Sequence, residues 1–125
     1  MFLNLLLVGL GSFAGGVARY AVALALTRWP AGQLPLATLA VNVGGCLLVG
    51  ILLGLIERHT VATAWRLLLV VGFCGGFTTF STFMNETFRL ARDGHMPTVL
   101  LYAGLSLVLG YAAVWSGYAL THWQR

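Results

Sequence analysis

Four long apolar runs, separated by short polar connections, make up most of the chain. They cover residues 3–26, 34–56, 65–90 and 97–120. A helix needs about 20 mostly apolar residues to cross the hydrocarbon core of a bilayer, so each run predicts one transmembrane helix. Tryptophans, which are enriched at membrane interfaces, lie at predicted helix ends at Trp29, Trp65 and Trp123. The pattern therefore predicts an all-α membrane protein with four transmembrane helices in a single domain, residues 1–125.

The composition excludes an ordinary soluble protein. Of the 125 residues, 59% are hydrophobic and 8% are charged, whereas soluble domains carry about 25% charged residues. The basic residues are dispersed between the apolar runs and form no patch, so we expect no nucleic-acid partner. Cys46 and Cys74 lie within apolar runs and match no metal or redox spacing, so we expect small buried hydrophobic residues there.

The positive charges give no preferred orientation in the membrane. Four spans place both termini on one side. Outside the spans and at their ends, Arg58, Arg66 and Arg125 fall on that side, and Arg28, Arg89 and Arg92 fall on the other. A bias in Lys and Arg sets the orientation of a membrane protein, and three against three is no bias. Two interpretations stay open: dual topology with two copies assembled antiparallel, or one orientation fixed by the amino terminus or another factor.

The third apolar run contains an unusual stretch, GFCGGFTTFSTF, at residues 72–83. Glycines weaken a helix, and hydroxyl side chains can satisfy the backbone groups that a break leaves free. The stretch therefore predicts that the third helix is broken at mid-membrane. A break would also expose carbonyl oxygens, which suit a hard cation. The alternative is a face of small residues for close helix packing.

Hydrogen-bond donors recur on the helices at helical spacing. Side chains that offer N–H or O–H groups are Asn42, Thr79, Ser81, Thr82, Tyr102 and Ser106. Phe80 and Phe83 are three residues apart and share a helix face, and the edge of an aromatic ring is positive. In a bundle, these faces would line a narrow and partly wet path whose donors suit an anion. No nucleophile–base pair or metal cluster is recognisable, so we do not expect an enzyme.

Two charged residues lie well inside predicted spans. Glu86 follows Thr79 and Thr82 on a polar stripe, and an intramembrane acid is by default a functional candidate. The alternative is a carboxyl group near the membrane edge that pairs with Arg89 or reaches water. Arg19 either extends its side chain to the interface or faces an aqueous entry.

Three motifs resemble those of a known family. GSFAGGVARY (residues 11–20), ATLAVNVGG (residues 37–45) and above all GFCGGFTTFSTFMNE (residues 72–86) resemble the small fluoride channels of bacteria, the Fluc or CrcB family. The resemblance implies a fluoride-selective channel in the inner (plasma) membrane that exports fluoride from the cytoplasm by passive flow. It also implies an antiparallel homodimer with two pores.

The resemblance further implies roles for single residues. The matching pore positions are Asn42, Phe80, Ser81, Thr82, Phe83, Tyr102 and Ser106. Arg19 matches a position near the aqueous vestibule. Backbone carbonyls of Gly75 and Thr78, doubled by the partner chain, would hold a structural sodium ion at the dimer centre. Gly110 and Met84–Asn85 depart from residues common in relatives.

Other functions remain open from the sequence. A small proton-coupled multidrug exporter can also be a four-span dual-topology dimer, but it needs a carboxylate deep in the bundle. The first span here has no acid, and Glu86 lies toward the end of the third. A third interpretation is an assembly subunit whose polar faces only pack helices together.

Overall fold

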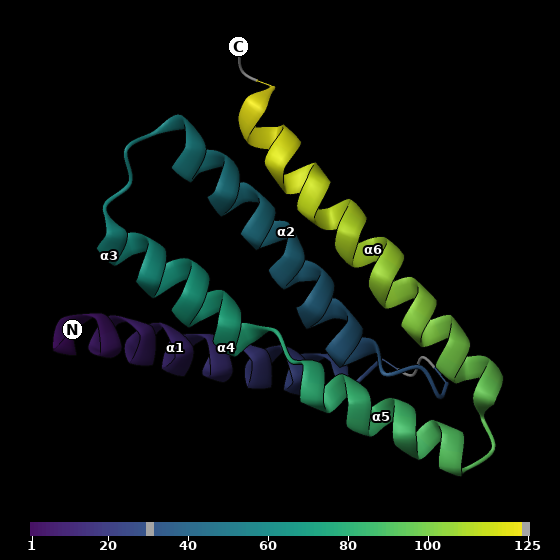
Figure 1. The fold of residues 1–125 in the computed structure, drawn as a ribbon. Coiled ribbons are helices and arrows are strands. Elements are labelled where there is room, and N and C mark those ends of the chain that lie inside the picture. Colours follow the sequence, from purple (N-terminus) through teal and green to yellow (C-terminus); the bar gives the residue numbers. More distant parts are fainter. Residues whose placement is uncertain (30–31, 124–125) are drawn as a thin grey trace.

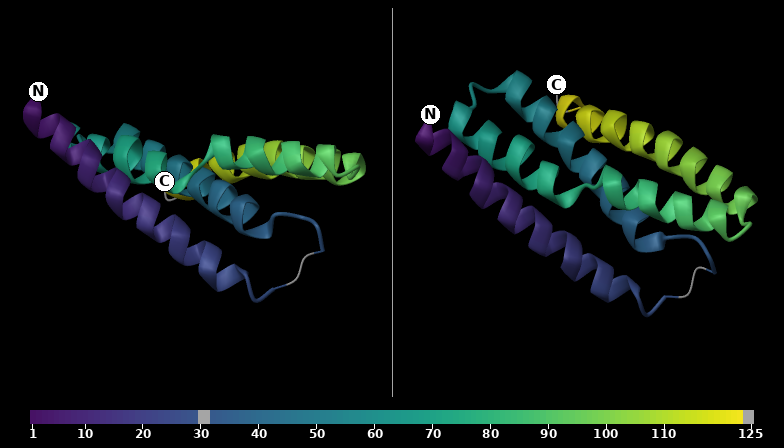
Figure 2. Two further views of the ribbon diagram at one scale, coloured as in Figure 1. Left: turned by 90° about the horizontal axis from the view of Figure 1, so that it is seen from below. Right: turned by 60° about the horizontal axis from the view of Figure 1, so that its bottom comes forward.

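The computed structural model describes residues 1–29 and 32–123, and within these ranges it contains helices and no strands. Four segments are long and apolar enough to cross a membrane: Phe2–Leu26, Leu36–Arg58, Thr63–Arg92 and Met96–His122. The four helices predicted from the apolar runs are thus confirmed, with ends that differ by one or two residues. The right view of Figure 2 shows the start of the first segment and the end of the fourth on the same side as the connection between the second and third segments.

The helices pack as two pairs (Figure 1). Helix α2 (Leu36–Arg58) lies along α6 (Met96–His122), and α1 (Phe2–Leu26) lies along the first half of the third segment. Glycines bring both pairs very close. A Cβ atom on Gly11 of α1 would lie 2.1 Å from the carbonyl oxygen of Leu68, and one on Gly50 of α2 would lie 2.1 Å from that of Val114. Only glycine permits this backbone approach.

The third segment is made of several helical pieces. It comprises α3 (Thr63–Arg66), a π-helical stretch η1 (Leu67–Cys74), a short α4 (Gly75–Phe77) and α5 (Phe80–Arg92). Between α4 and α5, Thr78 (φ −82°, ψ 156°) and Thr79 (φ −150°, ψ 118°) have extended backbone. We refer to these two residues as the extended segment.

The sequence left two explanations open for the glycines before the extended segment, a helix break or a face for close packing, and the glycines differ from one another in this respect. A Cβ atom on Gly72 would lie 2.9 Å from the Cα of Gly11, and one on Gly76 would lie 2.5 Å from the carbonyl oxygen of Ser12. These two glycines form a packing face against α1, which is the small-residue alternative. Gly75, in contrast, is exposed and has no atom of the chain within 4 Å of a Cβ position.

A single copy of the chain buries little of its own surface. Among the described residues, the buried hydrophobic side chains are Leu39, Val41, Cys74 and Tyr102. Large apolar side chains such as Phe13 (73% exposed) and Leu107 (74% exposed) lie on the outside. This distribution is that of a protein whose surroundings are apolar.

Candidate functional site

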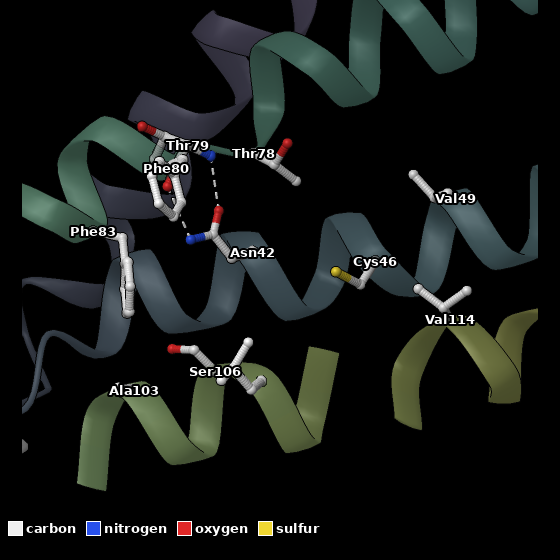
Figure 3. Close-up of a pocket in the computed structure, with 11 residues that line it drawn as sticks. Asn42, Cys46, Val49, Thr78, Thr79, Phe80, Phe83, Ala103, Ser106 and Val114 are labelled. Atoms are coloured by element: carbon white, nitrogen blue, oxygen red, sulfur yellow. Dashed lines mark hydrogen bonds between the residues drawn. The ribbon is translucent and has the colours of Figure 1, made fainter. Parts of the chain in front are cut away.

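A cavity of about 550 Å³ lies between α2, the start of α5 and α6 (Figure 3). It brings together six residues that the sequence singled out, from three different helices and the extended segment. The residues that line it are Asn42, Cys46, Val49, Thr78, Thr79, Phe80, Phe83, Ala103, Ser106, Leu107 and Val114. The lining is mostly apolar, with a few polar groups that converge on the same space, as in many ligand sites.

Asn42 of α2 is bonded to the backbone of the extended segment. Its Nδ2 donates to the carbonyl oxygen of Thr79 (3.1 Å), and the backbone N–H of Thr79 donates to its Oδ1 (2.8 Å). The side chain of Thr79 in turn caps α5, because its Oγ1 accepts from the N–H of Thr82 (3.3 Å) and donates to the hydroxyl of Thr82 (3.0 Å). The amide of Asn42 and the hydroxyl of Thr79 thus satisfy backbone groups of the extended segment and of the first turn of α5.

The carbonyl groups near the end of α4 differ in their hydrogen-bond partners. The N–H and the hydroxyl of Thr78 both donate to the carbonyl of Cys74 (3.0 and 2.8 Å). Arg19 of α1 donates from Nε to the carbonyl of Gly76 (3.1 Å), and a cation is favourable at a helix C-terminus. Within the described ranges, no hydrogen bond reaches the carbonyl oxygen of Gly75 or Thr78.

Aromatic rings form a row from the cavity into the helix bundle. The ring centroids of Phe80 and Phe83 are 6.1 Å apart, and those of Phe83 and Tyr102 are 4.9 Å apart. Phe80 is 74% exposed, whereas Tyr102 is fully buried. Ser106 of α6 faces the same cavity, and its buried Oγ has no hydrogen-bond partner in the part of the chain that the structure describes.

Glu86 lies beyond this row and accepts two hydroxyl groups. Thr38 of α2 donates to its Oε1 (2.7 Å), and Tyr102 of α6 donates to its Oε2 (2.8 Å). In the alternative interpretation of the sequence, Glu86 would pair with Arg89 or reach water, whereas in the structure its carboxylate accepts hydroxyls from two other helices. Glu86 and Thr38 also line a second cavity of about 300 Å³ beside the connection between α1 and α2. The hydroxyl of Tyr102, a candidate donor for an anion, is occupied by this carboxylate.

Some candidate residues lie outside the main cavity, and others were missed. Ser81 of α5 is exposed. Thr82 does not line the cavity, but its N–H and its hydroxyl are both bonded to the hydroxyl of Thr79. Cys46 lines the cavity, although the sequence predicted only a buried hydrophobic residue. Its position one helical turn after Asn42 was the available signal. Thr38 lies one helical turn before Asn42 on α2, and nothing in the sequence pattern indicated its bond to Glu86.

Comparison with known proteins gives a consistent result. A family described as "CrcB-like protein, Camphor Resistance (CrcB)" matches residues 6–118. The chain is 50% identical over 123 residues to "Fluoride-specific ion channel FluC" of Chlorobaculum tepidum, covering 97% of both chains. It is 48% identical to the protein of that name from Chlorobium luteolum (92% of this chain, 89% of the relative) and 45% identical to that from Acidobacterium capsulatum (88% and 89%).

Proposed function

This chain belongs to the CrcB family, and from that premise we propose that it is a fluoride channel through which fluoride leaves the cytoplasm by passive flow. It is a multi-pass membrane protein, and in bacteria its place is the inner membrane. Its relatives are named as ion channels rather than enzymes, in agreement with the expectation from the sequence.

The observation that carries this proposal is the lining of the main cavity. Asn42 and Ser106 supply N–H and O–H groups, and the edges of the Phe80 and Phe83 rings carry partial positive charge. None of the described residues in the lining is an arginine, lysine or histidine. Weak donors can replace the water around a small anion and still release it, whereas a fixed cation would retain it.

The route continues from the rings along α5. Thr79 and Thr82 provide hydroxyls at its start, and Glu86 lies one helical turn beyond Thr82. The two hydroxyls bonded to the carboxylate of Glu86 disperse its negative charge, which would otherwise repel an anion. Arg19, whose Nε is bonded at the end of α4, places a positive charge on the other side of the extended segment and suits an aqueous vestibule.

We further propose that the working unit is an antiparallel homodimer with two pores. The balance of three arginines against three supports insertion in both orientations. A single copy also leaves its site open, since Phe80 is 74% exposed and Ser81 faces outward. A second copy would close the cavity. Labelling of a C-terminal tag from each side of the membrane tests this, and a tag that is reachable from one side only would exclude dual topology.

The extended segment is proposed to lie at mid-membrane, where hydrocarbon offers no hydrogen bonds. The carbonyl oxygens of Gly75 and Thr78 accept no hydrogen bond among the described residues, and Gly75 is exposed. Oxygen ligands of this kind fit a hard cation, and those of two copies would hold a structural sodium ion. Such an ion would neutralise carbonyl groups that otherwise repel one another. Replacing sodium with a large organic cation should weaken the dimer and stop fluoride flux, and an unchanged dimer would contradict the assignment.

The alternative of a proton-coupled multidrug exporter is not favoured, because the relatives are named as ion channels. One experiment separates the two functions. In bacteria that lack a fluoride exporter, expression of this chain should restore growth in fluoride and give no resistance to cationic dyes. Dye resistance without fluoride resistance would favour the exporter.

A further inference from the structure

We propose that Asn42 is a positioning residue of the pore, in addition to any contact it makes with an anion. With both ends of its amide it holds the backbone of Thr79, and so it fixes the direction in which the adjacent Phe80 leaves the extended segment. The inference rests on the proposed function only in that flux is one of its readouts.

The geometry leaves one orientation for the Asn42 amide. Thr79 presents a backbone N–H and a backbone C=O to the same side chain, at 2.8 Å from Oδ1 and 3.1 Å from Nδ2. A flipped amide would place oxygen against oxygen and N–H against N–H. Figure 3 shows the two bonds side by side, between α2 and the start of α5.

These two backbone groups depend on Asn42 because the flanking helices do not satisfy them. Helix α4 ends at Phe77, and the carbonyl of Cys74 is taken by the N–H of Thr78. Thr79 is the N-cap of α5, yet within the described ranges its carbonyl accepts no backbone N–H from that helix. Unpaired backbone groups are costly away from water, so without Asn42 the peptide planes around Thr79 would turn to seek other partners.

The consequence reaches the aromatic rings. Phe80 is the first residue of α5, and the peptide plane that Asn42 holds is the one that precedes it. Its ring is 74% exposed, so packing within the chain restrains it little. The restraint on its backbone therefore sets the direction of its Cα–Cβ bond, and so limits the positions that the ring can take relative to Phe83, 6.1 Å away.

The bonds to Thr79 also limit what Asn42 can offer a ligand. A side-chain amide has two N–H donors and one oxygen. The oxygen and one N–H are engaged with Thr79, which leaves a single N–H for an anion. Ser106, in contrast, has a buried hydroxyl with no partner among the described residues and no bond to the extended segment. The two residues can thus be separated by mutation.

The test places 4-trifluoromethylphenylalanine at position 80 of the full chain and records its ¹⁹F spectrum in detergent without fluoride. Asn42→Leu removes both bonds at similar volume. Asn42→Asp keeps the acceptor for the Thr79 N–H but sets a carboxylate oxygen against the Thr79 carbonyl. Ser106→Ala is the matched control, because it removes a donor from the same cavity without touching Thr79. Fluoride flux into liposomes is measured for the same substitutions with natural Phe80.

We expect one narrow ¹⁹F signal in the parent and in Ser106→Ala, and a broadened or divided signal in both Asn42 variants, with loss of flux in all three. A narrow, single signal in the Asn42 variants together with lost flux would overturn the inference, since Asn42 would then act only as a donor. If Asn42→Leu does not fold, the signal of Asn42→Asp decides. A parent that conducts no fluoride would refute the proposed function, while the ¹⁹F spectra would still decide the role of Asn42.

Discussion

Alanine at Gly45 should push α2 away from the extended segment. Its Cβ atom would lie 2.2 Å from Cγ2 of Thr78, whereas ordinary contacts begin at 3.4 Å. The groups would have to separate by 3.4 − 2.2 = 1.2 Å. Thr78 cannot simply rotate its methyl group away, because its hydroxyl donates to the carbonyl of Cys74 at 2.8 Å. Overpacking of this kind costs about 1–3 kcal/mol, and the gain in helix propensity of about 1 kcal/mol offsets only part of it.

Two further variants test whether the loss of stability comes from the contact with the Thr78 methyl group. At Gly44, the nearest atom to a Cβ would be Cε1 of Phe77 at 3.9 Å, so Gly44→Ala should keep or slightly raise stability. Thr78→Ser removes Cγ2 but keeps the hydroxyl, and the remaining contacts of a Gly45 Cβ would be 3.4 and 3.7 Å. The double variant Gly45→Ala/Thr78→Ser should therefore recover most of the loss.

The assay is thermal unfolding of the purified protein in detergent, followed by tryptophan fluorescence and analysed as a double-mutant cycle. Gly45→Ala should have a lower midpoint than the parent and than Gly44→Ala. Equal midpoints for Gly45→Ala and Gly44→Ala would refute the close contact. A failure of Thr78→Ser to rescue would refute the assignment of the clash to the threonine methyl group.

Three other outcomes are expected. Gly15→Ala should lower the thermal midpoint, because its Cβ would lie 2.1 Å from the carbonyl oxygen of Phe73. Gly16→Ala should leave the midpoint unchanged, because no atom lies within 4 Å of its Cβ position, and equal midpoints for the two variants would contradict this packing. Phe83→Ile should reduce fluoride flux in liposomes by removing a ring edge from the cavity. Phe88→Ile, at an exposed site outside the cavity lining, should leave the flux unchanged, and a fully active Phe83→Ile variant would contradict a role of the ring edges in the pore. Three lysines added after Arg125 should force one orientation, measured by tag accessibility, and impair dimer assembly, measured by size-exclusion chromatography. Normal assembly of this variant would contradict dual topology.

The large features of the fold could be predicted because they depend on length and hydropathy. Four apolar runs predicted four spans, because the length and hydropathy of a run do not depend on which helices lie beside it. The π-helical stretch Leu67–Cys74 could not be predicted. It lies in a run that is apolar on every side, so the periodicity of the sequence carries no signal for the number of residues per turn. What the structure adds there is the close contact between Gly72 and Gly11 of α1.

The donors of the site could be identified from residue types, but their partners could not. Asn42 was expected to meet an anion or another helix, and it bonds to the backbone of Thr79, 37 residues away. Glu86 was predicted to be a functional carboxylate, with pairing to Arg89 or water as the alternative, and it accepts from Thr38, 48 residues away. These pairs form where helices cross, and the crossing points depend on glycine contacts that local sequence does not reveal.

Ion efflux from liposomes that contain the pure protein measures most directly whether this chain conducts fluoride. Liposomes loaded with fluoride or with chloride are diluted into ion-free buffer, a potassium ionophore balances the charge, and an ion-selective electrode follows each anion. We predict rapid fluoride efflux that depends on the protein, with chloride efflux no faster than from protein-free liposomes. Fluoride efflux at the protein-free rate would contradict the account.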